Sequence, residues 1–127
     1  MKKLLSALLL LTVLSSCSLS IHYLQRGKLN IPEKETYVVT YQAMLDENTS
    51  AKISYLDENG KRQKIKDFKG KWEKIMVMKS GSKTRIKVTG KGDKARGEFK
   101  VLVDGKVVGE QILTNKKIVF GLSFILP

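Results

Sequence analysis

The single cysteine and the single histidine of this 127-residue chain, Cys17 and His22, are the side chains best suited to nucleophilic, acid–base or soft-metal chemistry. A Ser-His-Asp or Cys-His arrangement would need His22 held within hydrogen-bond distance of a nucleophile, and His22 lies far in sequence from every candidate carboxylate. The carboxylates that could bind calcium weakly match no calcium-loop spacing and read as surface turn residues: Asp46, Glu47, Asp57 and Glu58. The sequence therefore predicts a protein that is not an enzyme and that holds neither a metal nor another cofactor.

The beginning of the chain has the layout of an export signal. Two lysines at positions 2–3 form a positive start, an apolar stretch covers residues 4–14, and small serines follow where a peptidase would cut. The apolar stretch could instead be a single-span anchor or a buried helix, but it is well short of the roughly 20 residues that a bilayer crossing needs. We expect residues 1–16 to be a signal peptide, cleaved between Ser16 and Cys17.

The segment LSSC (residues 14–17) closely resembles the lipobox of bacterial lipoproteins. The resemblance implies that a diacylglycerol is attached to the Cys17 thiol and that the freed amine is usually acylated. Two or three acyl chains would hold a protein on a membrane essentially permanently, which one chain does not. No thiol then remains for a disulfide or a thiolate metal site. Ser18, in place of an aspartate after the cysteine, favours the outer membrane facing the periplasm if the cell has two membranes.

Residues 17–35 are expected to form the lipidated cysteine and a flexible tether. Beyond Cys17 this run has no sustained hydrophobic period, and it contains Gly27 and Pro32. Its apolar side chains, Ile21, Tyr23 and Leu24, could instead lie against the folded domain or at the bilayer interface. The tether would let a folded head, residues 36–127, stand off the membrane.

From Thr36 onward the hydrophobic period is two, and turn residues recur about every ten positions, as in a sandwich or barrel. In a first strand over residues 36–45 the predicted inward set is Tyr37, Val39, Tyr41, Ala43 and Leu45. Asn59-Gly60 and Asp104-Gly105 predict two hairpins. The almost continuously apolar residues 116–126, after a last turn at 114–115, predict a central strand covered on both faces.

Residues 72–78 predict another strand, in which Ile75 and Val77 alternate with Met76 and Met78. Either both faces of this strand are covered or the two methionines are left for a partner, and core burial is the more frequent outcome. Trp72 and the tyrosines at 37, 41 and 55 are expected in the core, with the tyrosine hydroxyls at its rim. The predicted fold is all-β: an immunoglobulin-like, two-sheet antiparallel β-sandwich of seven or eight strands.

Several segments together resemble the small MmpS-like β-sandwich lipoproteins. They are the lipobox, TYVVTYQA, ISYLDENGKRQ, the tryptophan before KIMVMKSGS, and VLVDGKVVGEQ, which span residues 36–113 beyond the lipobox. The resemblance implies a role as an accessory partner of a large membrane exporter. The chain departs from the family pattern at Lys71, which stands where a proline precedes the tryptophan, and in being unusually basic.

Charge offers a second interpretation. The chain has 24 Lys and Arg against 12 Asp and Glu, a net charge of +12, and loss of the two signal lysines leaves +10. An exported cation of this size meets anionic lipid headgroups or acidic glycans and not nucleic acid. Lys91, Lys94 and Arg96 lie in GKGDKARG (residues 90–97), which reads as an exposed loop and a possible anion-binding site. The alternatives are a solvated flexible loop and lysines that serve solubility and protect sheet edges.

The sequence thus predicts a lipid-anchored cell-envelope protein that works by contact, as accessory or adaptor to a membrane transport or envelope protein. The alternative is a module that binds anionic envelope lipid or polysaccharide through the basic loop.

Overall fold

The computed structural model describes residues 18–127, which form seven strands, so the predicted signal peptide and Cys17 lie outside the described residues. The strands are β1 Leu19–Lys28, β2 Thr36–Leu45, β3 Ser50–Leu56, β4 Arg62–Phe68, β5 Lys71–Lys79, β6 Lys83–Val103 and β7 Lys106–Ile125. This confirms the all-β prediction and its strand number.

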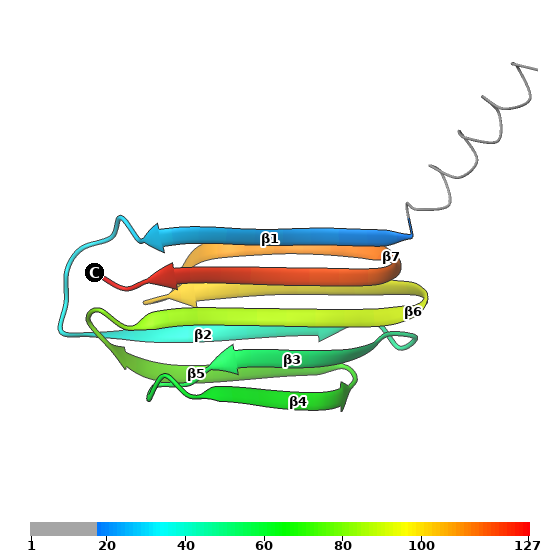
Figure 1. Cartoon of the computed structure of the whole chain (residues 1–127), viewed down its shortest axis with the longest axis horizontal. Helices are drawn as coiled ribbons and strands as arrows, with labels where there is room; N and C mark the ends of the chain where they lie inside the picture. Colours follow the sequence, from blue (N-terminus) through cyan, green and yellow to red (C-terminus); the bar gives the residue numbers. More distant parts are fainter. Residues whose placement is uncertain (1–17) are drawn as a thin grey trace, which may run out of the picture.

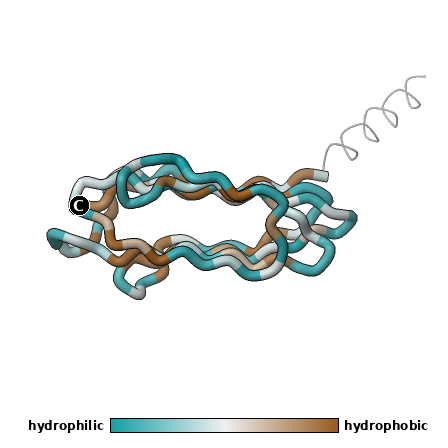
Figure 2. Tube along the Cα trace, turned by 90° about the horizontal axis from the view of Figure 1, so that it is seen from below, coloured by the Kyte–Doolittle hydropathy of each residue, from teal (hydrophilic) through white to brown (hydrophobic). Residues whose placement is uncertain are grey.

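The strands lie in two facing layers (Figures 1 and 2). Layer A consists of β1, residues 117–125 of β7, residues 83–91 of β6, β3 and β4; layer B consists of β5, β2, residues 95–103 of β6 and residues 106–115 of β7. With 21 and 20 residues, β6 and β7 are long enough to pass through both layers. The sandwich is therefore one hydrogen-bonded sheet folded over on itself, and not two separate sheets as predicted.

The strand pairs are antiparallel with one exception, since β1 runs parallel to β7 from Leu19↔Lys117 to Gln25↔Ser123. This corrects the prediction of a tether after Cys17. Leu19, Ile21 and Tyr23 alternate with Ser20 and His22, but this period covers only a few residues and its apolar side chains lie on the outer face, so the sequence shows no sustained strand period. Backbone pairing to β7 forms the strand, and its connection to β2 is fixed by Leu29, whose amide donates to the Ile125 carbonyl (2.9 Å).

The core lies between the layers. All five predicted inward residues of β2 are buried, and across the core the rings of Phe99 in layer B and Phe120 in layer A stack with centroids 4.9 Å apart. Burying a large apolar side chain contributes about 1.5–3 kcal/mol, so this core dominates the stability of the fold.

Residues 90–97 are not the loop that the sequence predicts, because they are part of β6 and turn it from layer A into layer B at a bulge between Lys91 and Ala95. Gly90 and Gly97 face the core: a Cβ on Gly90 would lie 2.9 Å from Ile118 Cγ1, and one on Gly97 would run into the Phe99 ring. These glycines serve a tight bend, a common use of glycine within strands. The predicted turn at 114–115 is likewise part of β7, which bends beside β6.

Candidate functional site

The residues whose side chains could take part in catalysis or bind a metal are dispersed in the fold. His22 is half-buried in β1, and its ring stacks on Phe120 with centroids 6.1 Å apart. Within residues 18–127 no group of three His, Cys, Asp or Glu side chains gathers in a way that could hold a metal ion. The same part of the chain contains no helix long and apolar enough to cross a membrane.

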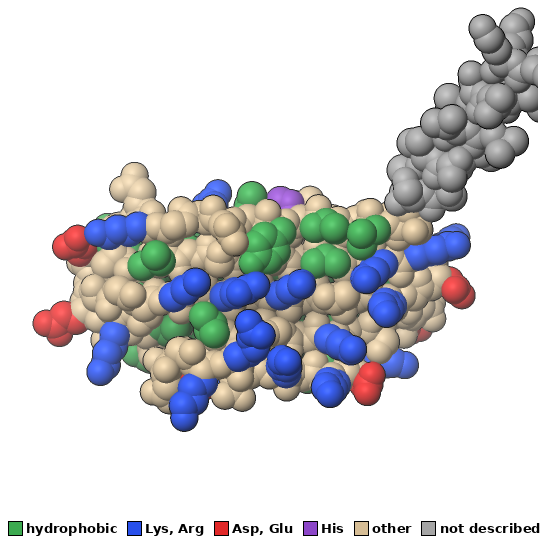
Figure 3. All heavy atoms as spheres, in the orientation of Figure 1, with side chains coloured by type: hydrophobic (Ala, Val, Ile, Leu, Met, Phe, Trp, Pro, Cys, Tyr) green, Lys and Arg blue, Asp and Glu red, His purple; other side chains and the backbone are tan. Residues whose placement is uncertain are grey.

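The three cations predicted as an anion site fall on either side of the β6 bulge. Lys91 lies in layer A, where it pairs with Lys117, and it belongs to a face rich in lysine and arginine (Figure 3). Arg96 lies in layer B, and its guanidinium forms an ion pair with Glu98 (3.1 Å). Lys94 is exposed in the bulge between them. The fold thus does not collect the three side chains on one face.

Layer B carries exposed apolar side chains on its outer face. Val38, Ile75, Val77 and Val107, here called the layer B patch, are 42%, 58%, 61% and 47% exposed. The strand register brings them together, because Val38 pairs with Val77, Thr40 pairs with both Ile75 and Leu102, and Leu102 pairs with Val107.

The orientation of β5 confirms that its methionines are buried, but it leaves the opposite, apolar face of the strand exposed. Met76 and Met78 are buried, as the more frequent outcome predicted, at 3% and 1% exposure. The opposite face is not covered, so the apolar groups left at the surface are Ile75 and Val77. Sequence reasoning missed this patch because β-branched residues in an alternating strand read as core.

A groove of about 980 Å³ adjoins the patch across the four strands of layer B. Its floor includes a polar row in which Gln42 Nε2 donates to Glu73 Oε2 (2.7 Å) and Lys100 Nζ lies 3.8 Å from Glu110 Oε2. Met44 and Ile112, 44% and 56% exposed, line its far side. Apolar side chains bordered by paired charges of both signs are typical of a surface that binds protein.

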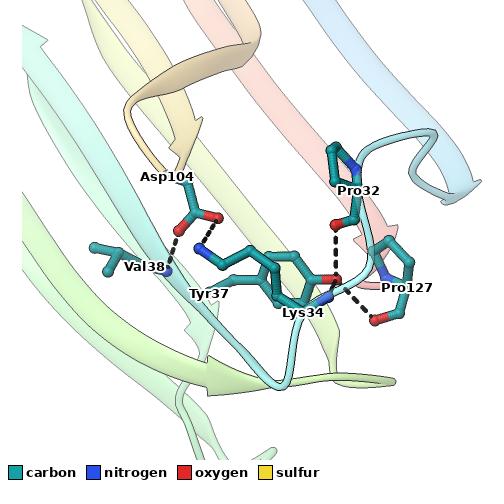
Figure 4. Close-up of polar contacts among 6 residues, drawn as sticks. All are labelled: Pro32, Lys34, Tyr37, Val38, Asp104 and Pro127. Carbon is teal, nitrogen blue, oxygen red and sulfur yellow. Dashed lines mark hydrogen bonds and ion pairs between the residues drawn. The ribbon is translucent and has the colours of Figure 1, made fainter.

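A hydrogen-bonded corner fixes the patch at the start of β2 (Figure 4). Asp104 Oδ1 accepts from the Val38 amide (2.9 Å) and Oδ2 from Lys34 Nζ (2.9 Å). These two donors, the Val38 amide first, lower the pKa of the Asp104 carboxyl below its usual value. Asp104 and Gly105 have φ of +50° and +79°, the left-handed conformation that the predicted two-residue hairpin requires.

The neighbouring Tyr37 hydroxyl joins three segments at the same corner. It accepts from the Lys34 amide (2.9 Å) and lies within donating distance of the backbone oxygens of Pro127 (3.0 Å) and Pro32 (3.2 Å) (Figure 4). Through Tyr37 the segment between β1 and β2 is linked both to β2 and to the end of the described chain, which further contradicts a free tether over these residues.

Aromatic packing holds β5 against the sandwich from the inside. Trp72, half-buried, lies with ring centroids 5.3 Å from Tyr55 and 6.5 Å from Tyr41. The Tyr41 hydroxyl is buried with no hydrogen-bond partner among residues 18–127, so the expectation of rim-facing hydroxyls is wrong for Tyr41. Burial raises the pKa of Tyr41 well above its usual value, and the nearby backbone of Arg85 lowers it by less.

Comparison with known proteins assigns the chain to a family. The model of a family described as Mycobacterium membrane protein matches residues 8–121, which is most of the chain. No curated protein matches the sequence significantly. The match agrees with the resemblance read from the hairpins and strands, and it extends into the apolar N-terminal segment. The chain therefore belongs to the Mycobacterium membrane protein family, whose members are MmpS-like.

Proposed function

We propose that this membrane-associated protein is a non-enzymatic accessory subunit, which binds an integral membrane transport or envelope protein through the layer B patch. The observation that carries the proposal is the outward orientation of Ile75 and Val77, 58% and 61% exposed beside Val38 and Val107. Membership of a membrane protein family supports the location, and the MmpS-like resemblance supports an exporter as partner.

The patch has the physical properties of a protein-binding surface. Valine and isoleucine have stiff side chains, so ordering them against a partner costs little conformational entropy. They stand on a sheet whose inner face is anchored by Met76 and Met78, which makes the surface preorganised. Among the described strands β5 pairs only with β2, so its other edge is open to a strand of the partner.

The proposal includes a lipid anchor on Cys17 and, in a cell with two membranes, a position on the outer membrane facing the periplasm. The lipobox resemblance of residues 14–17 supports this anchor. Mass spectrometry of the native protein tests it: we expect an N-terminal peptide that begins at Cys17 and carries acyl chains. An unmodified peptide that begins at Met1, or a free Cys17 thiol, would contradict the anchor.

Site-specific crosslinking tests the partner. A photoreactive amino acid at position 77 is expected to give an adduct with one reproducible integral membrane protein in native membranes. The matched control places the same group at Lys64, an exposed strand residue of layer A. The substitution Val77→Lys should abolish recovery of that protein while leaving the fold intact. No adduct at position 77, or the same adduct from both positions, would refute the assignment of the layer B patch.

A further inference from the structure

The outer face of layer A gathers cations from four strands. Because successive strand residues point to opposite faces, the outward residues of layer A are those that alternate with its buried residues. The outward cations are Lys52, Arg62, Lys64, Lys83, Arg85, Lys87, Lys91 and Lys117. Figure 3 shows Lys and Arg in rows across this face, with Asp and Glu only around its margin. In the sequence these residues span more than sixty positions, and the fold brings the cations of β3 and β4 beside those of β6 and β7.

These cations have no acidic partners within the described residues. The four ion pairs there involve Lys28, Lys34, Arg96 and Lys100, none of which belongs to the set. Lys91 and Lys117 even stand opposite each other on adjacent strands, where like charges destabilise a sheet. The outer face of layer B, by contrast, has two ion pairs between strand residues, Arg96–Glu98 and Lys100–Glu110. The uncompensated charge of layer A is therefore complementary to an extended anionic surface.

An apolar strip runs beside the cations on the same face. Leu19, Ile21 and Ile125 are 41%, 60% and 40% exposed, and the half-buried Tyr23 ring lies among them. Figure 3 shows hydrophobic side chains along β1 and β7 next to the rows of lysine and arginine. Exposed apolar and tyrosine side chains beside cations are the combination that favours the headgroup region of a bilayer.

The position of β1 relates the outer face of layer A to the membrane. The described chain begins at Ser18, immediately before β1, and β1 is an edge strand of layer A. The placement of the bilayer rests on the membrane attachment proposed above: with lipid on Cys17, or with residues 4–14 as the attachment, the bilayer would lie only a few residues from Leu19. We propose that the outer face of layer A docks on the anionic bilayer to which the N-terminus is attached, with β1 and its apolar strip at the headgroups. The layer B patch then faces away from the lipid.

Lysine footprinting of the full chain in lipid nanodiscs tests this docking. Acetylation rates are compared in discs of phosphatidylcholine alone and in discs that also contain phosphatidylglycerol. We expect Lys52, Lys64 and Lys87 to react several-fold more slowly in the anionic discs. Lys71, Lys79 and Lys106, exposed residues of layer B and its hairpin, should react equally in both. High salt should remove the protection while the chain stays in the disc, because headgroup attraction is screened.

Variants separate this face from other anion sites. In Lys52→Ser/Lys64→Ser/Lys87→Ser the remaining reporter Lys83 should lose its protection in anionic discs. The matched control Lys71→Ser/Lys79→Ser/Lys106→Ser, and the bulge variant Lys94→Ser/Arg96→Ser, should keep it. Three outcomes would each overturn the proposal. The two faces could react equally in anionic discs, the protection could already be complete in phosphatidylcholine, or the protection could require an added soluble polyanion. The discs contain no partner protein, so these outcomes are independent of the accessory function.

Discussion

The ring of Tyr23 lies directly over Gly121, on the neighbouring strand, so that a Cβ at position 121 would run into the ring. This contact pairs the first described strand with the last one, across nearly the whole described sequence. An aromatic ring over a glycine restores the packing that the missing side chain leaves open. It explains how residues that read as a tether are held on the sandwich.

A double-mutant cycle tests this contact. Gly121→Ala should displace the ring and cost about 1–3 kcal/mol of unfolding free energy, as overpacking does. Tyr23→Ala should also loosen β1, but the double variant should cost less than the sum, because the new methyl group occupies space that the ring has left. Denaturant unfolding and amide exchange over residues 19–25 measure both effects. Strict additivity would contradict direct packing of the two residues.

Tyr41→Phe should stabilise the protein. The buried Tyr41 hydroxyl lacks a partner, and an unsatisfied buried polar group costs about 1–3 kcal/mol, so removing it should raise the unfolding free energy by about 1 kcal/mol. Tyr37→Phe is the matched control, because its hydroxyl is bonded to Lys34 and Pro127. That control should be destabilised by a similar amount in the same denaturant titration. Destabilisation of the Tyr41 variant would show that its hydroxyl is satisfied.

Asp104 should make the unfolding free energy depend on pH in the acidic range. Because its pKa is lower in the folded protein than the ordinary value of about 3.9, its contribution is complete above that pH and is lost as the pH falls through the folded value. Asp104→Asn keeps a residue that tolerates positive φ but removes the charge. The stability difference between wild type and this variant should therefore be largest near neutral pH and should shrink below about pH 4. A difference that stays constant down to pH 2 would rule out the linkage.

Gly97→Ala tests the bend in β6. The added methyl would meet the Phe99 ring and lie 3.2 Å from Ile118 Cδ1, so we expect a loss of about 1–3 kcal/mol. Lys94→Ala, at an exposed position in the same bulge, should change stability by less than about 0.5 kcal/mol. Thermal unfolding of the two variants compares them. If residues 90–97 were a free loop, both substitutions would be neutral.

The sequence alone determined the features that depend on local geometry. The alternation from Tyr37 to Leu45 defined the buried face of β2, and Asp104-Gly105 defined a turn with positive φ. Period and backbone conformation are properties of a few consecutive residues, which is why these predictions are confirmed. The all-β class followed from several such segments.

Tertiary structure decided the features that depend on distant residues. In β5 both faces are apolar, and only the register with β2, where Val39 pairs with Met76, turns the methionines inward and leaves Ile75 and Val77 outside. The parallel pairing of β1 with β7, and the collection of Lys52, Lys64 and Lys87 on one face, join segments that no local pattern relates. Register is fixed by burying the whole set of inward side chains at once, so the two surfaces proposed for function exist only in the folded chain.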